Sequence, residues 1–350
     1  MKNFYSEAVR ISSRNTNSPS LQQQFNVIFG FIDRLQKSQA KANIDLHNIE
    51  SIYTALEMSQ LLKLEDLKKP SNWQELRTCM AYFLTKTIED NTKFQYTNNF
   101  PRYWPDSGTT INLGNNRKTI DSVIQQLCKL QDSWDITIVS FNYDLVVEAL
   151  LCACGLQTRY CLESEPDNLK SDSVKLLKLH GSINWERREV GQTKAGRAIK
   201  DLVAHHYYIK NKRNENKNFI VDPSSKDITT NFSENITPFI VPPIWNKSSY
   251  HNDVSDVWQE AAKALSKATH IYTAGYSLPQ TDGFFRQLYA LGTVGSAPLQ
   301  DFRVFDIEPE DSPNGVNSRF QNLLGRGAEN VYTYHSEGLN MLATQLACFG

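Results

Sequence analysis

Apolar residues in the first third of the chain recur at every third or fourth position, which is the stripe of an amphipathic helix. Three stretches carry this stripe: residues 21–36, 48–67 and 73–90. In the first of them the apolar positions are Phe25, Ile28, Phe29, Ile32 and Leu35. Residues 98–118 are instead rich in Pro, Gly, Asn and Asp, and they predict a loop. We therefore expect a mainly helical segment over residues 1–117, packed on the rest of the chain.

From Thr119 onwards short apolar runs alternate with amphipathic stretches. The runs that predict strands are 135–144, 174–185, 236–245, 270–278, 301–309 and 329–335. The stretches that predict helices are 119–131, 144–155, 253–268, 281–291 and 317–325. Strands that alternate with helices indicate an α/β fold built on a parallel sheet. The expected core is a Rossmann-like parallel sheet with helices on both faces, formed by residues 118–185 and 237–350.

A polar segment, residues 186–236, interrupts this core. It is rich in Lys, Asn and Asp and predicts an insertion, such as a hairpin with a loop. Its basic part, residues 209–219, could contact phosphate or form a solvated loop. The sequence leaves both interpretations open.

Composition narrows the class of protein. Of the 350 residues, 40% are hydrophobic and 21% are charged, and the net charge is −1. No overall attraction to nucleic acid or to a membrane is expected from that balance. No apolar run approaches the roughly 18 residues of a membrane span, and the N-terminus lacks the apolar core of a secretory signal. We therefore expect a cytoplasmic protein that does not contact a membrane.

The six cysteines do not predict a metal centre. None of them forms a C-x-x-C pair, so a structural zinc site is not expected. Cys152, Cys154 and Cys161 form the nearest cluster. The first two lie in an apolar run, where cysteine usually serves as a small buried side chain. Metal or redox chemistry is the alternative for this cluster.

Polar residues gather where the predicted strands end, which is the edge at which open parallel sheets bind ligands. The first such end is SFNYD, with Ser140, Asn142 and Asp144. Asn142 and Asp144 are two positions apart, so they face the same side of an extended segment. An amide and a carboxylate presented together suit a ribose or a nicotinamide amide. The alternative is that both residues cap the following helix.

The second strand end is KLHGS, with His180 and Gly181. A histidine exposed at this edge titrates near neutral pH, as a general base must. Gly181 would let a ligand approach the backbone closely. A purely structural role for a single histidine at a strand end is the alternative.

The third strand end, AGYSLPQTD, carries Gly275 and Ser277, and Asp282 falls within the opening of the next helix. Small residues and free backbone N–H groups in such a loop can hold a phosphate. An ordinary tight turn explains the same residues equally well. Asp306 ends the following strand, where an acidic side chain can accept hydrogen bonds from a ribose diol.

The motifs SFNYD, KLHGSINW, PFIVPP, a Trp-bearing helix and AGYSLPQTDGFF follow one another in this order. Together they resemble the sirtuin-like NAD-consuming domains of bacterial antiphage defence proteins. The resemblance covers residues 119–345, and the helical segment upstream fits more loosely. It implies that Asn142 and Asp144 surround the nicotinamide ribose, that His180 is catalytic, and that the Gly/Ser loop lies at the NAD.

Two features of that family are missing. Its domains open with a strand and a Gly-Ala-Gly-x-Ser loop that holds the pyrophosphate, and residues 1–40 contain no such loop. The four-cysteine zinc module of protein-deacylating sirtuins is also absent. The second absence favours an activity other than deacylation.

The resemblance implies a NAD glycohydrolase, for which NAD is the substrate and no metal is expected. The bond between nicotinamide and ribose breaks, and the products are nicotinamide and ADP-ribose. In the resembled family this activity depletes NAD during phage infection, with homo-oligomers, a partner ATPase or a nucleic-acid sensor as activators. One rival function is a NAD-dependent protein deacylase that uses the same residues. The other is a non-catalytic module that binds a nucleotide or docks a partner, which the missing glycine loop favours.

Overall fold

The computed structural model describes most of the chain. The described residues are 4–14, 19–37, 44–91, 94–96, 111–112, 117–153, 156–165, 173–192, 198–204, 209–210, 216–217, 227–228, 237–241, 253–279, 282–295, 297–325 and 327–349. Among them, no helix combines the length and the apolar character that crossing a membrane requires.

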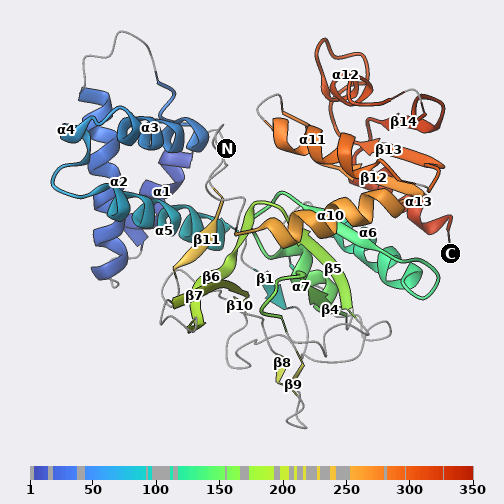
Figure 1. The fold of residues 1–350 in the computed structure, drawn as a ribbon, viewed down its shortest axis with the longest axis horizontal. Helices are drawn as coiled ribbons and strands as arrows, with labels where there is room; N and C mark the ends of the chain where they lie inside the picture. The colour runs from blue at the N-terminus through green and yellow to red at the C-terminus, as the bar shows by residue number, and fades with distance from the viewer. Residues whose placement is uncertain are drawn as a thin grey trace.

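The N-terminal residues form a helical lobe at one side of the molecule (Figure 1). Its helices are α1 (Phe4–Arg14), α2 (Pro19–Lys37), α3 (Ile49–Leu61), α4 (Glu65–Lys68) and α5 (Trp73–Asn91). Asn48 caps α3, since its side chain accepts a hydrogen bond from the Glu50 N–H. The apolar stripes meet in one core, where the rings of Phe25, Phe29 and Phe83 pack together. The mainly helical N-terminal segment is confirmed for these residues.

A first parallel sheet follows the helical lobe. Its strands lie in the order β3 (Thr137–Ser140), β5 (Ser173–Lys178) and β4 (Gln157–Arg159). Helices α6 (Arg117–Leu130) and α7 (Val146–Ala153) cover one face, where Ile124 and Leu150 pack on Val174 of β5. Apart from the short β4, each of these elements matches a stretch that the sequence predicts as the same type of structure, although α6 and β5 begin one or two residues before the predicted stretch.

A second parallel sheet is formed by the C-terminal part of the chain. Its strands lie in the order β12 (His270–Ala274), β13 (Asp301–Phe305) and β14 (Tyr332–His335). The helices around it are α10 (Ser255–Lys267), α11 (Gly283–Gly292), α12 (Val316–Gln321), the short 3₁₀ helix η2 (Glu329–Val331) and α13 (Leu339–Ala347). The sequence interpretation did not include α13, although Leu339, Leu342 and Leu346 stand at helical spacing.

An antiparallel sheet lies between the helical lobe and the parallel sheets. Its order is β11 (Pro238–Ile240), β6 (Gly181–Gln192) and β7 (Ala198–Ala204). Within the run 174–185, β5 ends at Lys178, at the strand end expected in KLHGS, and after a turn at residues 179–180 the chain continues as β6. The hairpin of β6 and β7 confirms the hairpin expected in the polar insertion.

The rest of the insertion is described only in part. Short strands are present at β8 (Ile209–Lys210), β9 (Asn216–Lys217) and β10 (Asp227–Ile228), and β10 pairs with β1 (Phe94–Tyr96), which also pairs with β2 (Ile111–Asn112). Most of the basic stretch 209–219 lies outside the described residues.

The chain is thus a mixed α/β protein with small parallel sheets and an N-terminal helical part. Its parallel strands form two three-stranded sheets rather than the single sheet that the sequence suggested. The helical lobe is joined to the remainder by apolar packing, because Tyr143, Leu145, Ile183 and Ile240 belong to its core. The loop that follows β3 therefore packs directly against the N-terminal helices.

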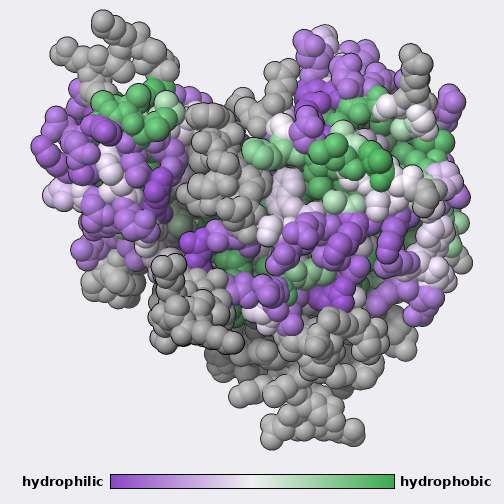
Figure 2. Space-filling view, viewed as in Figure 1, coloured by the Kyte–Doolittle hydropathy of each residue, from purple (hydrophilic) through white to green (hydrophobic). Residues whose placement is uncertain are grey.

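Apolar side chains are also visible on the surface in Figure 2, over the end of α3 and over the region of α11. The exposed residues there are Leu61 and Leu62 beside α3, and Phe284 and Leu291 in α11. Helix α11 comes shortly after the strand-end loop of β12. An apolar surface therefore borders that loop.

Candidate functional site

The loop after β3, residues 141–144, is held against the turn after β5. The Leu179 N–H donates to the Ser140 carbonyl over 3.1 Å, and the Ile183 N–H donates to the Tyr143 carbonyl over 3.1 Å. These bonds tie both ends of the loop to the segment that carries His180. The first two strand ends singled out in the sequence are therefore neighbours in the fold.

A buried ion pair supports this loop. Lys178 is 1% exposed and Glu148 is 2% exposed, and Lys178 Nζ lies 2.8 Å from Glu148 Oε1. The same ammonium group donates to the Asp144 carbonyl, and the Tyr160 hydroxyl donates to Glu148 Oε1 over 3.2 Å. Burial raises the pKa of Glu148, and the neighbouring Lys178 ammonium opposes that rise.

His180 is buried, with only 8% of its surface exposed. Its ring centroid lies 5.4 Å from that of Phe141 and 6.3 Å from that of Tyr143. Phe141 in turn stacks on Tyr276 at 4.1 Å and meets Phe285 edge-on at 5.0 Å. The expectation of an exposed histidine is wrong, because the rings of Phe141 and Tyr143 in the loop after β3 pack beside it.

Asn142 and Asp144 have different surroundings. Asn142 is exposed, and its backbone N–H donates to Ser140 Oγ over 3.2 Å. Asp144 is half-buried, and its Oδ1 accepts a hydrogen bond from the Val146 N–H at 3.0 Å, in the first turn of α7. The capping alternative is confirmed for Asp144. The Asn142 side chain, by contrast, is accessible to a ligand.

The two glycines of the predicted site adopt left-handed backbone angles for different reasons. Gly181 has φ +80°, and a Cβ there would lie 2.6 Å from the Phe239 carbonyl oxygen of β11. The close backbone approach expected of a ligand at Gly181 is thus made by β11. Gly275 has φ +64°, and a Cβ there would meet nothing within 4 Å. Gly275 therefore leaves open space at the end of β12.

Three further candidates lie at the ends of β12 and β13. Ser277 is exposed, and its carbonyl accepts a hydrogen bond from Arg319 Nε at 2.8 Å. Asp282 is buried, and its Oδ2 accepts from the Tyr276 hydroxyl at 2.7 Å. Burial and this carboxylate raise the pKa of Tyr276. Asp306 is half-buried, and its Oδ1 accepts the N–H two residues further on at 3.0 Å.

The two parallel sheets leave a space between β3 and β12, which we call the interstrand slot. A cavity of about 510 Å³ opens on the side of α10 and α11, and another of about 570 Å³ opens on the side of α6 and α13. Ser140 and Asn142 line both cavities, Gly275 lines the first, and Asp144 lines the second. The structure thus brings these four predicted residues together around one end of the slot.

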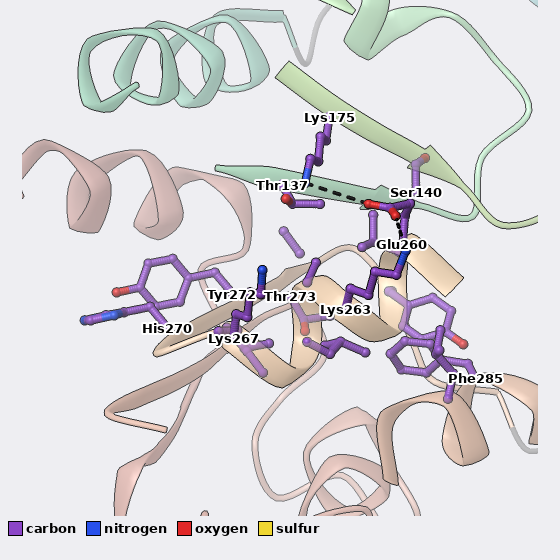
Figure 3. Close-up of a pocket in the computed structure, with 18 of the residues that line it drawn as sticks. Thr137, Ser140, Lys175, Glu260, Lys263, Lys267, His270, Tyr272, Thr273 and Phe285 are labelled. Carbon is purple, nitrogen blue, oxygen red and sulfur yellow. Dashed lines mark hydrogen bonds and ion pairs between the residues drawn. The ribbon is translucent and has the colours of Figure 1, made fainter. Parts of the chain in front are cut away.

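The α10 side of the slot carries charged side chains (Figure 3). Lys263 Nζ donates to Glu260 Oε1 over 2.7 Å, and Lys175 Nζ lies 3.8 Å from Glu260 Oε2. The hydrogen bond from Lys263 lowers the pKa of Glu260. This wall is therefore polar, whereas the opposite side is lined mainly by apolar residues of α6 and α13.

Metal chemistry has no visible centre within the described residues. They contain no group of three or more His, Cys, Asp or Glu side chains placed to hold a metal ion. Cys154 and the side chain of Cys152 lie outside them, so their predicted burial is not tested.

Comparison with known proteins adds no relative. No family model matches the chain, and no curated protein matches it. The function must therefore be inferred from the site.

Sequence reasoning missed two sets of residues at the site. The Lys178–Glu148 pair was hidden because its members come from β5 and α7, 30 residues apart. The only sign of this pair in the sequence was that Lys178 interrupts an apolar run. Phe141 and Tyr276 looked like ordinary strand-end aromatics, and nothing local predicts that their rings stack.

Proposed function

We propose that this chain is a NAD glycohydrolase. It cleaves the bond between nicotinamide and ribose of NAD with water, and releases nicotinamide, ADP-ribose and a proton. The observation that carries the proposal is the hydrogen-bonded contact between the loop with Asn142 and Asp144 and the turn with His180. This contact lies at the carboxyl ends of parallel strands, where open α/β sheets bind ligands. The proposed function goes with a Rossmann-like parallel sheet that has helices on both faces.

Each residue has a role in this reaction. The ribose becomes positively charged as neutral nicotinamide leaves, and the Asp144 carboxylate stabilises that charge. The exposed Asn142 amide orients the ribose or the attacking water. His180 accepts a proton from that water. Because His180 is buried beside Phe141, this ring has to shift before substrate and water reach the imidazole.

The remaining candidates serve the rest of the substrate in this proposal. Gly275 offers open space for a phosphate, and Ser140 and Ser277 flank the strand ends with hydroxyl groups. Asp282 holds Tyr276 in place, and Asp306 accepts from a ribose diol. Through the resemblance the proposal extends to NAD depletion in antiphage defence, by a cytoplasmic homo-oligomer or together with a partner ATPase or nucleic-acid sensor.

Nicotinamide release from NAD tests the proposal. Wild-type protein should release nicotinamide without any peptide or acylated protein present, and Asn142→Ala and His180→Gln should each lower the rate by about 10²-fold or more. Asn142 is exposed, so its substitution should leave the urea unfolding midpoint unchanged, which separates a lost reaction from a lost fold. Full turnover in His180→Gln would exclude His180 as the base.

A non-catalytic nucleotide-binding module is the second candidate, and the burial of His180 favours it. The variant Phe141→Ala discriminates between the two. For a hydrolase it should raise the reactivity of His180 towards diethyl pyrocarbonate and raise or preserve nicotinamide release. For a binding module, His180 becomes reactive but no nicotinamide appears, while NAD binding persists in calorimetry.

A further inference from the structure

The interstrand slot lies between two strands that run in the same direction. At the amino ends, Trp134 meets His270 edge-on with ring centroids 4.9 Å apart. At the carboxyl ends, Phe141 stacks on Tyr276 at 4.1 Å. Figure 3 shows the same direction, since Thr137 to Ser140 of β3 runs parallel to His270 to Thr273 of β12. The slot is therefore framed by aromatic contacts at both ends.

Both strands are edges where the slot lies. β3 pairs with β5 and β12 pairs with β13, and the described residues show no backbone hydrogen bond between β3 and β12. Every residue of β3 and of β12 is only half-buried, whereas β5 and β13 each contain fully buried positions. Alternate N–H and C=O groups of both strands therefore point into the slot, and among the described residues they have no strand partner there.

The sequences of these edges lack charged residues and prolines. Residues 136–139, Ile-Thr-Ile-Val, and residues 271–274, Ile-Tyr-Thr-Ala, are rich in β-branched and aromatic side chains. Such runs are typical of parallel strands that helices cover on both faces. Exposed edges are normally protected by charges, prolines or short length. Both strands are short, with four residues in β3 and five in β12, but neither run contains a charge or a proline. Their side chains therefore do not prevent another strand from pairing with these edges.

The walls of the slot define what would fill it. Towards α6 and α13 they are apolar, with Ile120, Val123, Leu127, Leu342 and Leu346. Towards α10 they carry the ion-paired Lys175, Glu260 and Lys263. Because successive side chains of a strand face opposite sides, a strand in the slot would be apolar at one position and small or polar at the next.

We propose that the interstrand slot receives one extended segment of a partner polypeptide as a parallel β-strand. The segment spans about four residues, or roughly 13 Å, and pairs with β3 on one side and β12 on the other. Its alternate side chains are apolar towards α6 and α13 and small or hydroxylated towards α10. The two three-stranded sheets then become one seven-stranded parallel sheet, and the segment ends beside Asn142 and Gly275. The proposal does not depend on NAD cleavage.

Hydrogen exchange of the free protein is the first test. In β3 and β12 every second amide, the one that faces the slot, should exchange at least about tenfold faster than amides of β5 and β13. If all amides of β3 and β12 are protected as well as those of β5 and β13, the slot is closed and the proposal is overturned.

A peptide in trans is the second test. The probe is the acetylated and amidated peptide Lys-Val-Thr-Val-Thr-Val-Lys, which carries the expected alternation. It should bind saturably to the full chain and slow the fast amides of β3 and β12 at least about tenfold. The matched control has the same sequence with N-methyl groups on its three valines, which removes the N–H donors on one edge. The control should give no protection.

Three results would overturn the proposal. The peptide could fail to protect these amides at millimolar concentration. The N-methylated control could protect them equally well, which would indicate apolar contact without strand pairing. Protection could also appear without peptide as protein concentration rises, together with a dimer mass, which would assign the slot to a second copy of this chain.

Discussion

Removing the buried ammonium of Lys178 should weaken the fold and the site together. Lys178 is 1% exposed and pairs with the equally buried Glu148 at 2.8 Å. Substituting Lys178→Met keeps the length of the side chain but leaves the Glu148 carboxylate without its cation. Breaking a buried pair in this way costs about 3 to 5 kcal/mol of unfolding free energy. Burial already raises the pKa of Glu148, so the variant should hold this residue protonated to higher pH.

The double variant Lys178→Met with Glu148→Leu removes the unpaired charge. The double variant should regain most of the unfolding free energy that Lys178→Met loses, because two apolar side chains replace the ion pair. The Tyr160 hydroxyl, which donates to Glu148 Oε1 over 3.2 Å, then loses an acceptor at a cost of about 1 to 3 kcal/mol. The double variant should therefore be more stable than Lys178→Met and less stable than wild type by roughly that amount.

Urea unfolding, monitored by circular dichroism, measures the unfolding free energy of the single and the double variants. The coupling free energy of the cycle should be at least ~2 kcal/mol, since the two residues are in contact. Nicotinamide release adds a second measure, because Lys178 also donates to the Asp144 carbonyl, and the double variant should stay slow after stability is regained. If each single variant loses less than about 1 kcal/mol, the pair does not hold the loop and this reasoning fails.

Two paired comparisons test other parts of the fold. Gly275→Ala should lower the unfolding free energy by about 1 to 2 kcal/mol, because alanine disfavours the positive φ at this position. Gly181→Ala should lower it by a further ~1 to 3 kcal/mol, because its Cβ would also clash with the Phe239 carbonyl. Equal losses of stability in thermal unfolding would refute this contact. Burial raises the pKa of Cys79 to about 11, so iodoacetamide at pH 8 should label the exposed Cys348 and spare Cys79. Because folding raises this pKa, the contribution of Cys79 to stability should hold below pH 9 and fall as the pH approaches 11.

Much of the fold follows from periodicity. The stripes at 21–36 and 73–90 became α2 and α5, and the apolar run at 301–309 contains β13. These elements were predictable because each depends on its own spacing of apolar residues. The strand end at KLHGS was predictable, but the antiparallel strand β6 that follows it was not, since β6 depends on the approach of β11 to Gly181. That approach joins residues about 60 positions apart in the sequence.

The closeness of the strand ends that carry the candidate residues was predictable, and the burial of those residues was not. Strand-end polar residues pointed to one edge of the sheet, and the hydrogen bonds between the Ser140 and Leu179 segments agree with that. His180 is buried beside Phe141, whose ring stacks on Tyr276 from the loop after β12 in the other parallel sheet. The sequence shows where each aromatic residue lies along the chain, but it does not show which ring it contacts across the interstrand slot.

At the interstrand slot, the residues of two strands differ from those that are usual at an exposed sheet edge. The runs at β3 and β12 have the composition of strands that helices cover on both faces, and among the described residues each is paired along one edge only. Ordinary edges are protected by charges, prolines or short length. Both strands are short, but the runs 136–139 and 271–274 contain no charge and no proline, and the apolar wall of α6 and α13 lies beside them. Conflict between a local pattern and its surroundings commonly marks a functional position, and here it marks the place of a missing strand.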